Sequence, residues 1–309
     1  MNILFILPHV KVVGGVRRVM EMSNRLMDAG HSVSIANPGG AKCKWMDCKA
    51  RFVDINQAKK ERFDVSTFSL SDQYKECIAT NARLKIYWVL AAEALYKDKR
   101  VPLEALSRNE YTFFANSTFT SKYITDRKRL RYKPPIIPGG INPDHFKYVP
   151  ETPKEFDVLY YGSKRPWKGG KIIESALLGR PVKILKMDGL GTPQDQMYTL
   201  YNRCTVFVSA SQCEGFGFTV LEAMKCGCPV VCTDDGGNRD FVKHRYNALL
   251  TTRTPSAIYA NTMNLVNNIV LRKSLIGNGL ITANDKKYNW DNVTKSFIDN
   301  IKLFSRPVQ

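Results

Sequence analysis

The sequence lacks the features of a membrane-spanning or zinc-binding protein. No apolar run approaches the roughly 18 residues that a bilayer-spanning helix needs, and the longest run near the start, residues 3–7, ends at Pro8. The eight cysteines lack the paired C-x2-C spacing of a zinc site. We therefore expect no spanning helix, no cleaved signal peptide, no metal, and a cytoplasmic protein with reduced thiols, with peripheral attachment to the inner membrane face left open.

Acidic side chains are scarce relative to basic ones. The chain has 46 Lys and Arg against 28 Asp and Glu, a net charge of +18. Both halves share the excess, with 25 basic against 14 acidic residues in 1–150 and 21 against 14 in 151–309. A field of this size attracts polyanions or anionic surfaces.

Internal repeats and low-complexity tracts are also absent, and short apolar runs alternate with helical patterns instead. The runs that we expect to form strands are residues 2–7, 32–36, 85–90, 111–115, 157–161, 182–187, 205–209 and 229–233. Continuous apolar strands separated by helices indicate parallel sheets covered on both faces. A Pro- and Gly-rich stretch, residues 134–150, predicts a boundary between two α/β domains.

Two glycine-containing segments suggest anion binding. Gly14 and Gly15 follow the first expected strand and open a helix, where backbone N–H groups and the helix dipole favour a phosphate, although an ordinary tight turn would have the same glycines. The stronger segment runs Glu-Gly-Phe-Gly-Phe-Thr-Val-Leu-Glu from Glu214 to Glu222. It predicts two carboxylates beside a glycine-rich loop that leads into a short helix.

The second segment resembles the Glu-x7-Glu signature of the family 4 retaining glycosyltransferases, which have the GT-B fold. Further matches follow in the family's order, at Gly14-Gly15, residues 30–33, 115–117, 137–146, 161–169 and 234–237, and Trp290. The resemblance implies an α/β protein with two Rossmann-like domains facing across a cleft. It implies an acceptor-binding domain at 1–149, a nucleotide-sugar-binding domain at 150–289, and a C-terminal helix at 290–309 that crosses back to the first domain.

The resemblance also implies roles for individual residues. Glu214 would contact hydroxyls of the donor sugar, Glu222 would bind the nucleotide ribose, and Lys168 would neutralise the leaving diphosphate. The remaining donor-binding residues, several acting through their backbone amides, would be Gly14, Gly15, Gly215, Phe216, Gly217, Phe218 and Thr219.

Three departures from the family pattern affect these expectations. Ser163 stands where the family has Arg, so we choose Arg165 over Lys164 as the second catalytic cation. The segment 162–201 is short, which leaves the nucleotide base open. No histidine occurs between His31 and His145, and Glu93 is the nearest polar candidate beside the acceptor, although a solvent-exposed glutamate at a helix start would read the same.

The resemblance implies a retaining, metal-independent hexosyl- or pentosyltransferase without a cofactor. Its substrate would be a nucleotide-diphosphate sugar, with UDP favoured over GDP or ADP. Fixed cations and N–H groups would stabilise the departing diphosphate, a contribution worth about 3 to 4 kcal/mol per well-placed donor.

The acceptor is inferred from charge. Basic clusters lie mostly in the first half, and we expect Arg127, Lys128 and Arg129 to bind the acceptor. We slightly favour DNA with hydroxymethylated bases over an anionic membrane surface, with aromatics such as Trp45, Trp88, Phe113 or Phe114 available to hold an extruded base. The alternatives are transfer to a membrane lipid or cell-envelope glycan, and a non-catalytic binding protein of the same fold. The sequence gives no oligomeric state.

Overall fold

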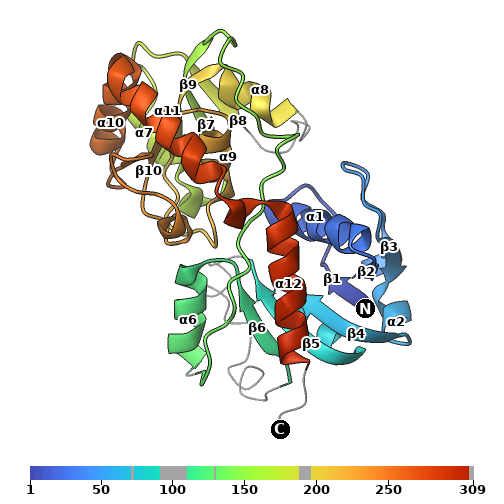
Figure 1. The fold of residues 1–309 in the computed structure, drawn as a ribbon. Helices are drawn as coiled ribbons and strands as arrows, with labels where there is room; N and C mark the ends of the chain where they lie inside the picture. The colour runs from blue at the N-terminus through green and yellow to red at the C-terminus, as the bar shows by residue number, and fades with distance from the viewer. Residues whose placement is uncertain (71–72, 91–109, 129, 188–195, 306–309) are drawn as a thin grey trace. The chain divides into compact units, whose positions relative to one another are not determined.

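The computed structural model describes residues 1–70, 73–90, 110–128, 130–187 and 196–305 (Figure 1). The chain forms two compact units. The first consists of Met1–Gly139 together with Trp290–Gln309, and the second of Gly140–Asn289. The division at Gly139 and Gly140 falls inside the Pro- and Gly-rich stretch 134–150, and the segment that follows the second unit returns to the first.

The first unit contains a parallel sheet that has six strands in the described ranges, in the order β3-β2-β1-β4-β5-β6. The strands are β1 (Asn2–Ile6), β2 (Ser32–Asn37), β3 (Arg51–Asp54), β4 (Arg62–Phe68), β5 (Asn81–Val89) and β6 (Thr112–Ala115). The helices are α1 (Gly14–Asp28), α2 (Ile55–Ala58), α3 (Tyr74–Ile78), α6 (Thr118–Lys128) and α12 (Trp290–Phe304).

Each face of this sheet is covered by its own set of helices. On one face, α1 and α12 pack together, and Phe297 of α12 joins Val19 of α1 and Trp88 of β5 in one apolar cluster. A second cluster on the opposite face includes Cys77 of α3 and Ile124 of α6. The last helix therefore completes the core of the first unit.

The second unit has a five-stranded parallel sheet in its described part, with the order β11-β10-β9-β7-β8. Its strands are β7 (Phe156–Tyr161), β8 (Ile184–Met187), β9 (Cys204–Ser209), β10 (Val230–Cys232) and β11 (Leu249–Leu250). Its helices are α7 (Gly170–Leu177), α8 (Met197–Asn202), α9 (Phe218–Lys225), α10 (Pro255–Asn267) and α11 (Ile269–Ala283), with short 3-10 turns η3 (Pro166–Lys168) and η5 (Gly237–Asp240).

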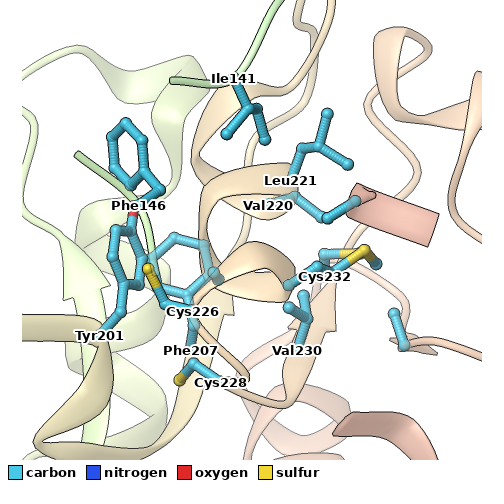
Figure 2. Packing of buried hydrophobic residues seen from close by; sticks show 14 of the residues in the cluster. Ile141, Phe146, Tyr201, Phe207, Val220, Leu221, Cys226, Cys228, Val230 and Cys232 are labelled. Carbon is cyan, nitrogen blue, oxygen red and sulfur yellow. The ribbon is translucent and has the colours of Figure 1, made fainter. Parts of the chain in front are cut away.

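The core of the second unit packs α9 and α8 against the sheet. Val220 and Leu221 of α9 share one apolar cluster with Phe207 and Val230 of the strands, and Figure 2 shows Tyr201 of α8 beside Phe207. Several cysteines lie in the same cluster, and all eight cysteines of the chain, each within the described ranges, are free thiols. Burial raises the pKa of the Cys204 thiol to about 12, so that thiol stays protonated at neutral pH.

All the strands expected from the sequence are present, but β3, β4 and β11 were not expected. Strand β4 is central in its sheet, between β1 and β5. Its sequence is Arg-Phe-Asp-Val-Ser-Thr-Phe. The charged residues at its start are more typical of an exposed surface than of a central strand. The charges lie at the strand's start, where the Asp64 carboxylate accepts a hydrogen bond from the Asn2 N–H at 2.8 Å. No helix in the described part of the chain is long and apolar enough to cross a bilayer.

Candidate functional site

A lysine–glutamate ion pair lies beside the glycine-rich loop of the second unit. The Lys168 Nζ donates to both carboxylate oxygens of Glu214, at 2.6 and 2.7 Å. Ser211 Oγ donates to one of the same oxygens at 2.7 Å. The side chains of Lys168 and Glu214 are 20% and 18% exposed, so the pair is largely desolvated but still open to a ligand. The structure thus brings together two of the three residues expected to be catalytic.

Three hydrogen bonds connect the segments that carry this pair. Lys168 ends the turn η3, and Glu214 lies in the loop after β9. The backbone N–H of Gln212 donates to the Trp167 carbonyl at 2.7 Å. The Arg253 guanidinium donates to the Pro166 and Ala210 carbonyls, each at 2.8 Å, and so cross-links the turn to the end of β9. These bonds fix the backbone of the two segments that carry the Lys168 and Glu214 side chains.

The backbone of the loop from Glu214 to Gly217 packs directly against the backbone at the start of η5. The Glu214 N–H donates to the Asp235 carbonyl at 2.9 Å. A Cβ on Gly237 would stand 2.5 Å from the Phe216 nitrogen, so only glycine fits there. Phe216 is 2% exposed and packs against Phe241 and Tyr288, which leaves only its backbone for a ligand.

Helix α9 begins directly after this loop without a side-chain cap. Gly217 precedes the helix with φ +88°, a left-handed conformation that favours glycine. Gly217 has no side chain that could cap the helix, and the positive end of the helix dipole at this start favours an anion. The expected contact of the backbone amides here with a donor stays a prediction.

Asp235 is a buried carboxyl directly behind the ion pair, and it was not among the expected site residues. Its side chain accepts the Asn238 N–H at 2.9 Å, and Asn238 Oδ1 accepts the Asp235 N–H at 3.3 Å. Burial, reinforced by the nearby charge of Glu214, raises the pKa of Asp235 well above its ordinary value, while Lys168 opposes this shift. Asp235 therefore keeps its proton to a higher pH than an ordinary aspartate does.

Glu222 lies on α9 and is almost fully buried. Its residue is 2% exposed, and the Tyr201 hydroxyl donates to one carboxylate oxygen at 3.2 Å. Its expected contact with a ribose stays a prediction.

Gly14 and Gly15 form the start of α1, in the first unit. A Cβ built on either glycine would meet nothing within 4 Å, so neither is required by packing. One turn later, Arg18 is buried and donates to the carbonyls of Ile137 and Pro138, the latter at 2.8 Å. Burial lowers the pKa of Arg18 to about 9. Phosphate binding by the two glycines stays a prediction.

The remaining expected residues are placed as follows. Arg165 is exposed, with its guanidinium carbon 5.8 Å from the centre of the Trp167 ring, and its role as second cation stays a prediction. Glu93 and Arg129 lie outside the described residues, as do the side chains of Arg127 and Lys128 at the end of α6. Among the residues that the structure describes, no three His, Cys, Asp or Glu side chains gather as a metal site.

The aromatics expected to hold an extruded base are mostly core residues. Trp88 and Phe114 are 0% exposed and Phe113 is 3% exposed, so that expectation is wrong for these three. Trp88 lies on β5, and Phe113 and Phe114 point to opposite faces of the edge strand β6, where each side chain joins the apolar cluster of its own face. Trp45 is half-buried, and its Nε1 donates to the Val10 carbonyl at 2.7 Å.

Sequence reasoning missed three residues that hold the site together, Ser211, Asp235 and Arg253. Ser211 lies three positions before Glu214, and Asp235 immediately precedes the Gly236-Gly237 pair that was noted. The closeness of Ser211 and Asp235 to recognised motifs in the sequence could have indicated that they belong to the site. Arg253 offered none, because it lies far along the chain and acts on main-chain carbonyls.

Comparison with known proteins covers part of the chain by sequence and nearly all of it by structure. Residues 171–280 match the family described as Glycosyl transferases group 1. The chain is 35% identical over 98 residues to an uncharacterized glycosyltransferase of Methanocaldococcus jannaschii, covering 31% of this chain and 27% of that protein. It is 32% identical over 111 residues to the O-antigen chain mannosyltransferase B of Escherichia coli, covering 36% of this chain and 28% of that protein. The chain thus matches under a third of the length of these relatives.

Solved structures share the fold over almost the whole chain. HepE of Anabaena in complex with UDP-glucose superposes with a TM-score of 0.77 at 16% identity, covering 98% of this chain and all (100%) of that one. The expected GT-B fold is confirmed by this likeness.

Proposed function

Because the chain has the GT-B fold and residues 171–280 belong to the family of glycosyl transferases group 1, we propose that the protein transfers a sugar from a nucleotide-diphosphate donor to an acceptor hydroxyl. The observation that carries this proposal is the Lys168–Glu214 pair at the mouth of the glycine-rich loop. It places a cation and a carboxylate in one partly buried site beside the start of α9, where the helix dipole favours an anion, and a diphosphate-linked sugar requires such a combination.

The pair changes partners when the donor binds. In the structure Lys168 neutralises Glu214. A diphosphate would take over the Lys168 ammonium and the N–H groups at the start of α9, and Glu214 would then accept hydrogen bonds from the sugar hydroxyls. Ser211 keeps its bond to Glu214 and holds the carboxylate in place during the exchange. Glu222 would bind the ribose, with Gly14 and Gly15 near the phosphates.

The transfer step follows from these contacts. The bond between the anomeric carbon and the phosphate oxygen breaks, and Lys168, assisted by Arg165, stabilises the charge on the departing diphosphate. The acceptor oxygen attacks from the same face, so the anomeric configuration is retained, and its proton passes to the departing phosphate. No metal or cofactor is needed for this balance.

A UDP-sugar is the favoured donor. HepE, which shares the fold, was solved with UDP-glucose. A nucleotide at 100 times its dissociation constant stabilises the folded form by about 2.7 kcal/mol, so thermal shift with UDP-, GDP- and ADP-sugars ranks the candidates.

For the acceptor, we favour a cell-envelope glycan or lipid over DNA. Three of the four aromatics considered for base extrusion are core residues, and the E. coli relative is named for O-antigen mannosyl transfer. Gel-shift assays with duplex DNA at increasing salt provide the opposing test, since phosphate contacts weaken as salt rises.

The experiment that tests the proposal compares two lysine–glutamate pairs of the same unit. We expect Lys168→Gln and Glu214→Gln to lower the rate of nucleoside diphosphate release from the preferred donor by about a hundredfold each. The matched control is the pair of Lys186 on β8 and Glu174 on α7, also joined at 2.6 Å but more exposed. Lys186→Gln and Glu174→Gln should leave the rate unchanged.

Two outcomes would contradict the proposal. If no nucleotide sugar were turned over and Glu214→Gln left ligand binding unchanged, the alternative of a non-catalytic binding protein would replace it. If the Lys186 and Glu174 variants lost as much activity as the Lys168 and Glu214 variants, the site would be elsewhere in the unit.

A further inference from the structure

Helix α11 is apolar on nearly all sides and yet lies at the surface of the second unit (Figure 1). Its inner side packs through Leu275 and Gly279, the latter against Met224 of α9. On its outer side, Val270 is 77% exposed and Ile281 66% exposed, three turns apart on one stripe, and Ile269 at the helix start is 56% exposed. A helix with this many apolar residues is normally buried, yet no described residue of the unit covers this outer side.

A basic turn lies against the same helix. Residues Lys243, His244, Arg245 and Tyr246 are all exposed. Asn278 of α11 donates to the Tyr246 carbonyl at 2.9 Å, and the buried Asn247 side chain donates to Thr282 of α11 at 2.9 Å. These bonds hold the turn beside the exposed stripe.

The conformation of the turn is fixed and strained. Arg245 has φ +60°, a left-handed conformation that is unfavourable for an L-residue other than glycine. The backbone N–H of Arg245 donates to the Ala248 carbonyl at 2.8 Å, and Asn247 accepts the Lys243 N–H at 2.7 Å. Strain of this kind persists only where the surroundings over-determine it, so the exposed Arg245 and Tyr246 side chains are presented in a fixed place.

The whole segment lacks acidic residues. Residues 241–284, which include the turn, β11, α10 and α11, contain no Asp or Glu, whereas the chain as a whole has 28 in 309 residues. Its cations include Lys243, Arg245 and Lys273, which are all exposed. The surface is therefore both apolar and positively charged.

We propose that this surface, made of the turn 243–246 and the outer stripe of α11 and called here the α11 face, docks on an anionic lipid bilayer. Val270, Ile269 and Ile281 would enter the boundary between headgroups and acyl chains, Tyr246 would lie at headgroup depth, and the cations would meet lipid phosphates. The proposal goes beyond sugar transfer and holds whether or not the chain is an enzyme.

Charge and chemistry favour a bilayer over other occupants. Two copies of a chain with net charge +18 repel each other, which disfavours pairing through this face. Nucleic acid would use the cations but has no use for three exposed aliphatic side chains, since its recognition relies on phosphate contacts and on hydrogen bonding or stacking with bases. An anionic bilayer can contact both the cations and the exposed aliphatic side chains.

The test is flotation of the full chain with vesicles of phosphatidylcholine and phosphatidylglycerol in equal parts, against vesicles of phosphatidylcholine alone. We expect binding to the mixed vesicles only, weakening as salt rises. Val270→Gln with Ile281→Gln should lower the partition coefficient about tenfold or more, because apolar burial is lost. Lys243→Gln with Arg245→Gln should lower it roughly thirtyfold, at about 1 kcal/mol per cation.

Matched controls separate the α11 face from the general charge of the protein. Leu303→Gln changes an aliphatic residue on α12 that is 58% exposed, and Lys49→Gln with Lys295→Gln removes two exposed cations of the first unit. Neither should alter the partition coefficient. All changed positions are exposed, and circular dichroism verifies that each variant folds.

The proposal is overturned by any of four results. These are no binding to mixed vesicles, equal losses in the control variants, full binding after the α11 and turn changes, or a shift from dimer to monomer on changing Val270 and Ile281 without loss of vesicle binding. Loss of duplex DNA binding in the turn variant, with vesicle binding intact, would assign the face to nucleic acid instead.

Discussion

At the scale of single residues, Asp235 gives the clearest pH-dependent prediction. Its folded-state pKa is raised above the unfolded value of about 3.9, so the folded protein holds this proton to higher pH than the unfolded chain. The stability that Asp235 contributes is fully present below the unfolded pKa and is lost as pH rises through the folded pKa. Relative to Asp235→Asn, which keeps an acceptor for the Asn238 N–H, the native protein should lose up to about 1.4 kcal/mol per pH unit in that window.

Urea denaturation from pH 4 upward measures this difference, and the neighbouring Asp234 supplies the control. Asp234 is half exposed and bonds Arg239, which holds its pKa below the ordinary value. The contribution of Asp234 to stability therefore depends on pH in the opposite way. It is present above the unfolded pKa and is lost as pH falls through the folded pKa. The difference between the native protein and Asp234→Asn should thus be flat above pH 5. A constant offset for Asp235→Asn at every pH would show that Asp235 titrates normally.

What the sequence predicts at this scale depends on whether a residue acts through a local pattern. Glu214, Lys168 and Gly217 stand in short ordered strings, and the geometry of the Lys168–Glu214 pair agrees with the expectation that they share a site. Asp235 lies next to such a string, but its importance comes from burial, which its own neighbours in sequence do not reveal. The opposite error occurs at Trp88 and Phe114. Both were expected to lie at the surface and hold a base, but both are buried.

At the scale of elements, the start of α1 tests whether a phosphate approaches its backbone. Gly15→Ala adds a Cβ that meets no protein atom, and the substitution should stabilise the helix by up to about 1 kcal/mol. If donor phosphates contact this backbone, the same Cβ should weaken donor affinity by about tenfold, or roughly 1.4 kcal/mol. Calorimetric titration with the preferred nucleotide sugar measures the affinity.

Gly277→Ala on α11 is the matched control for that change. It is also a helical glycine whose added Cβ would meet nothing within 4 Å. It should stabilise the protein similarly and leave donor affinity unchanged. Unaltered affinity in Gly15→Ala would remove α1 from the donor site.

Strand β4 shows why elements escape prediction. Periodicity identified the strongly apolar strands, whereas β4 begins with Arg62 and carries Asp64, Ser66 and Thr67. Two of its polar side chains have partners from other segments: Asp64 accepts a hydrogen bond from the Asn2 N–H at 2.8 Å, and Ser66 accepts one from the Thr80 hydroxyl at 3.0 Å. Such pairings exist only after the sheet has assembled, so a local pattern does not contain them.

At the scale of the whole molecule, α12 makes the stability of the first unit depend on the end of the chain. Phe297 is 0% exposed, with its ring centre 5.1 Å from that of Trp88 and 6.1 Å from that of Phe5. Phe297→Ala should lower the free energy of unfolding of the first unit by about 3 to 5 kcal/mol. Leu303→Ala, on the exposed side of the same helix, should change it by less than about 0.5 kcal/mol.

Tryptophan fluorescence separates the two units in this experiment. Trp88 and Trp290 report on the first unit and Trp167 on the second. In a variant that retains only Trp167, Phe297→Ala should leave the unfolding midpoint unchanged, whereas variants that retain Trp88 should show a lower midpoint. Equal shifts at both reporters would mean that the units unfold as one.

The return of α12 to the first unit also governs the order of events during synthesis. The ribosome completes every residue of the second unit, up to Asn289, before Trp290, Val293, Phe297 and Ile301 emerge to fill the apolar cluster around α1. The first unit, most of which is translated first, therefore completes its core last. Until α12 emerges, the face of its sheet that α12 covers stays exposed as an apolar surface to which chaperones can bind.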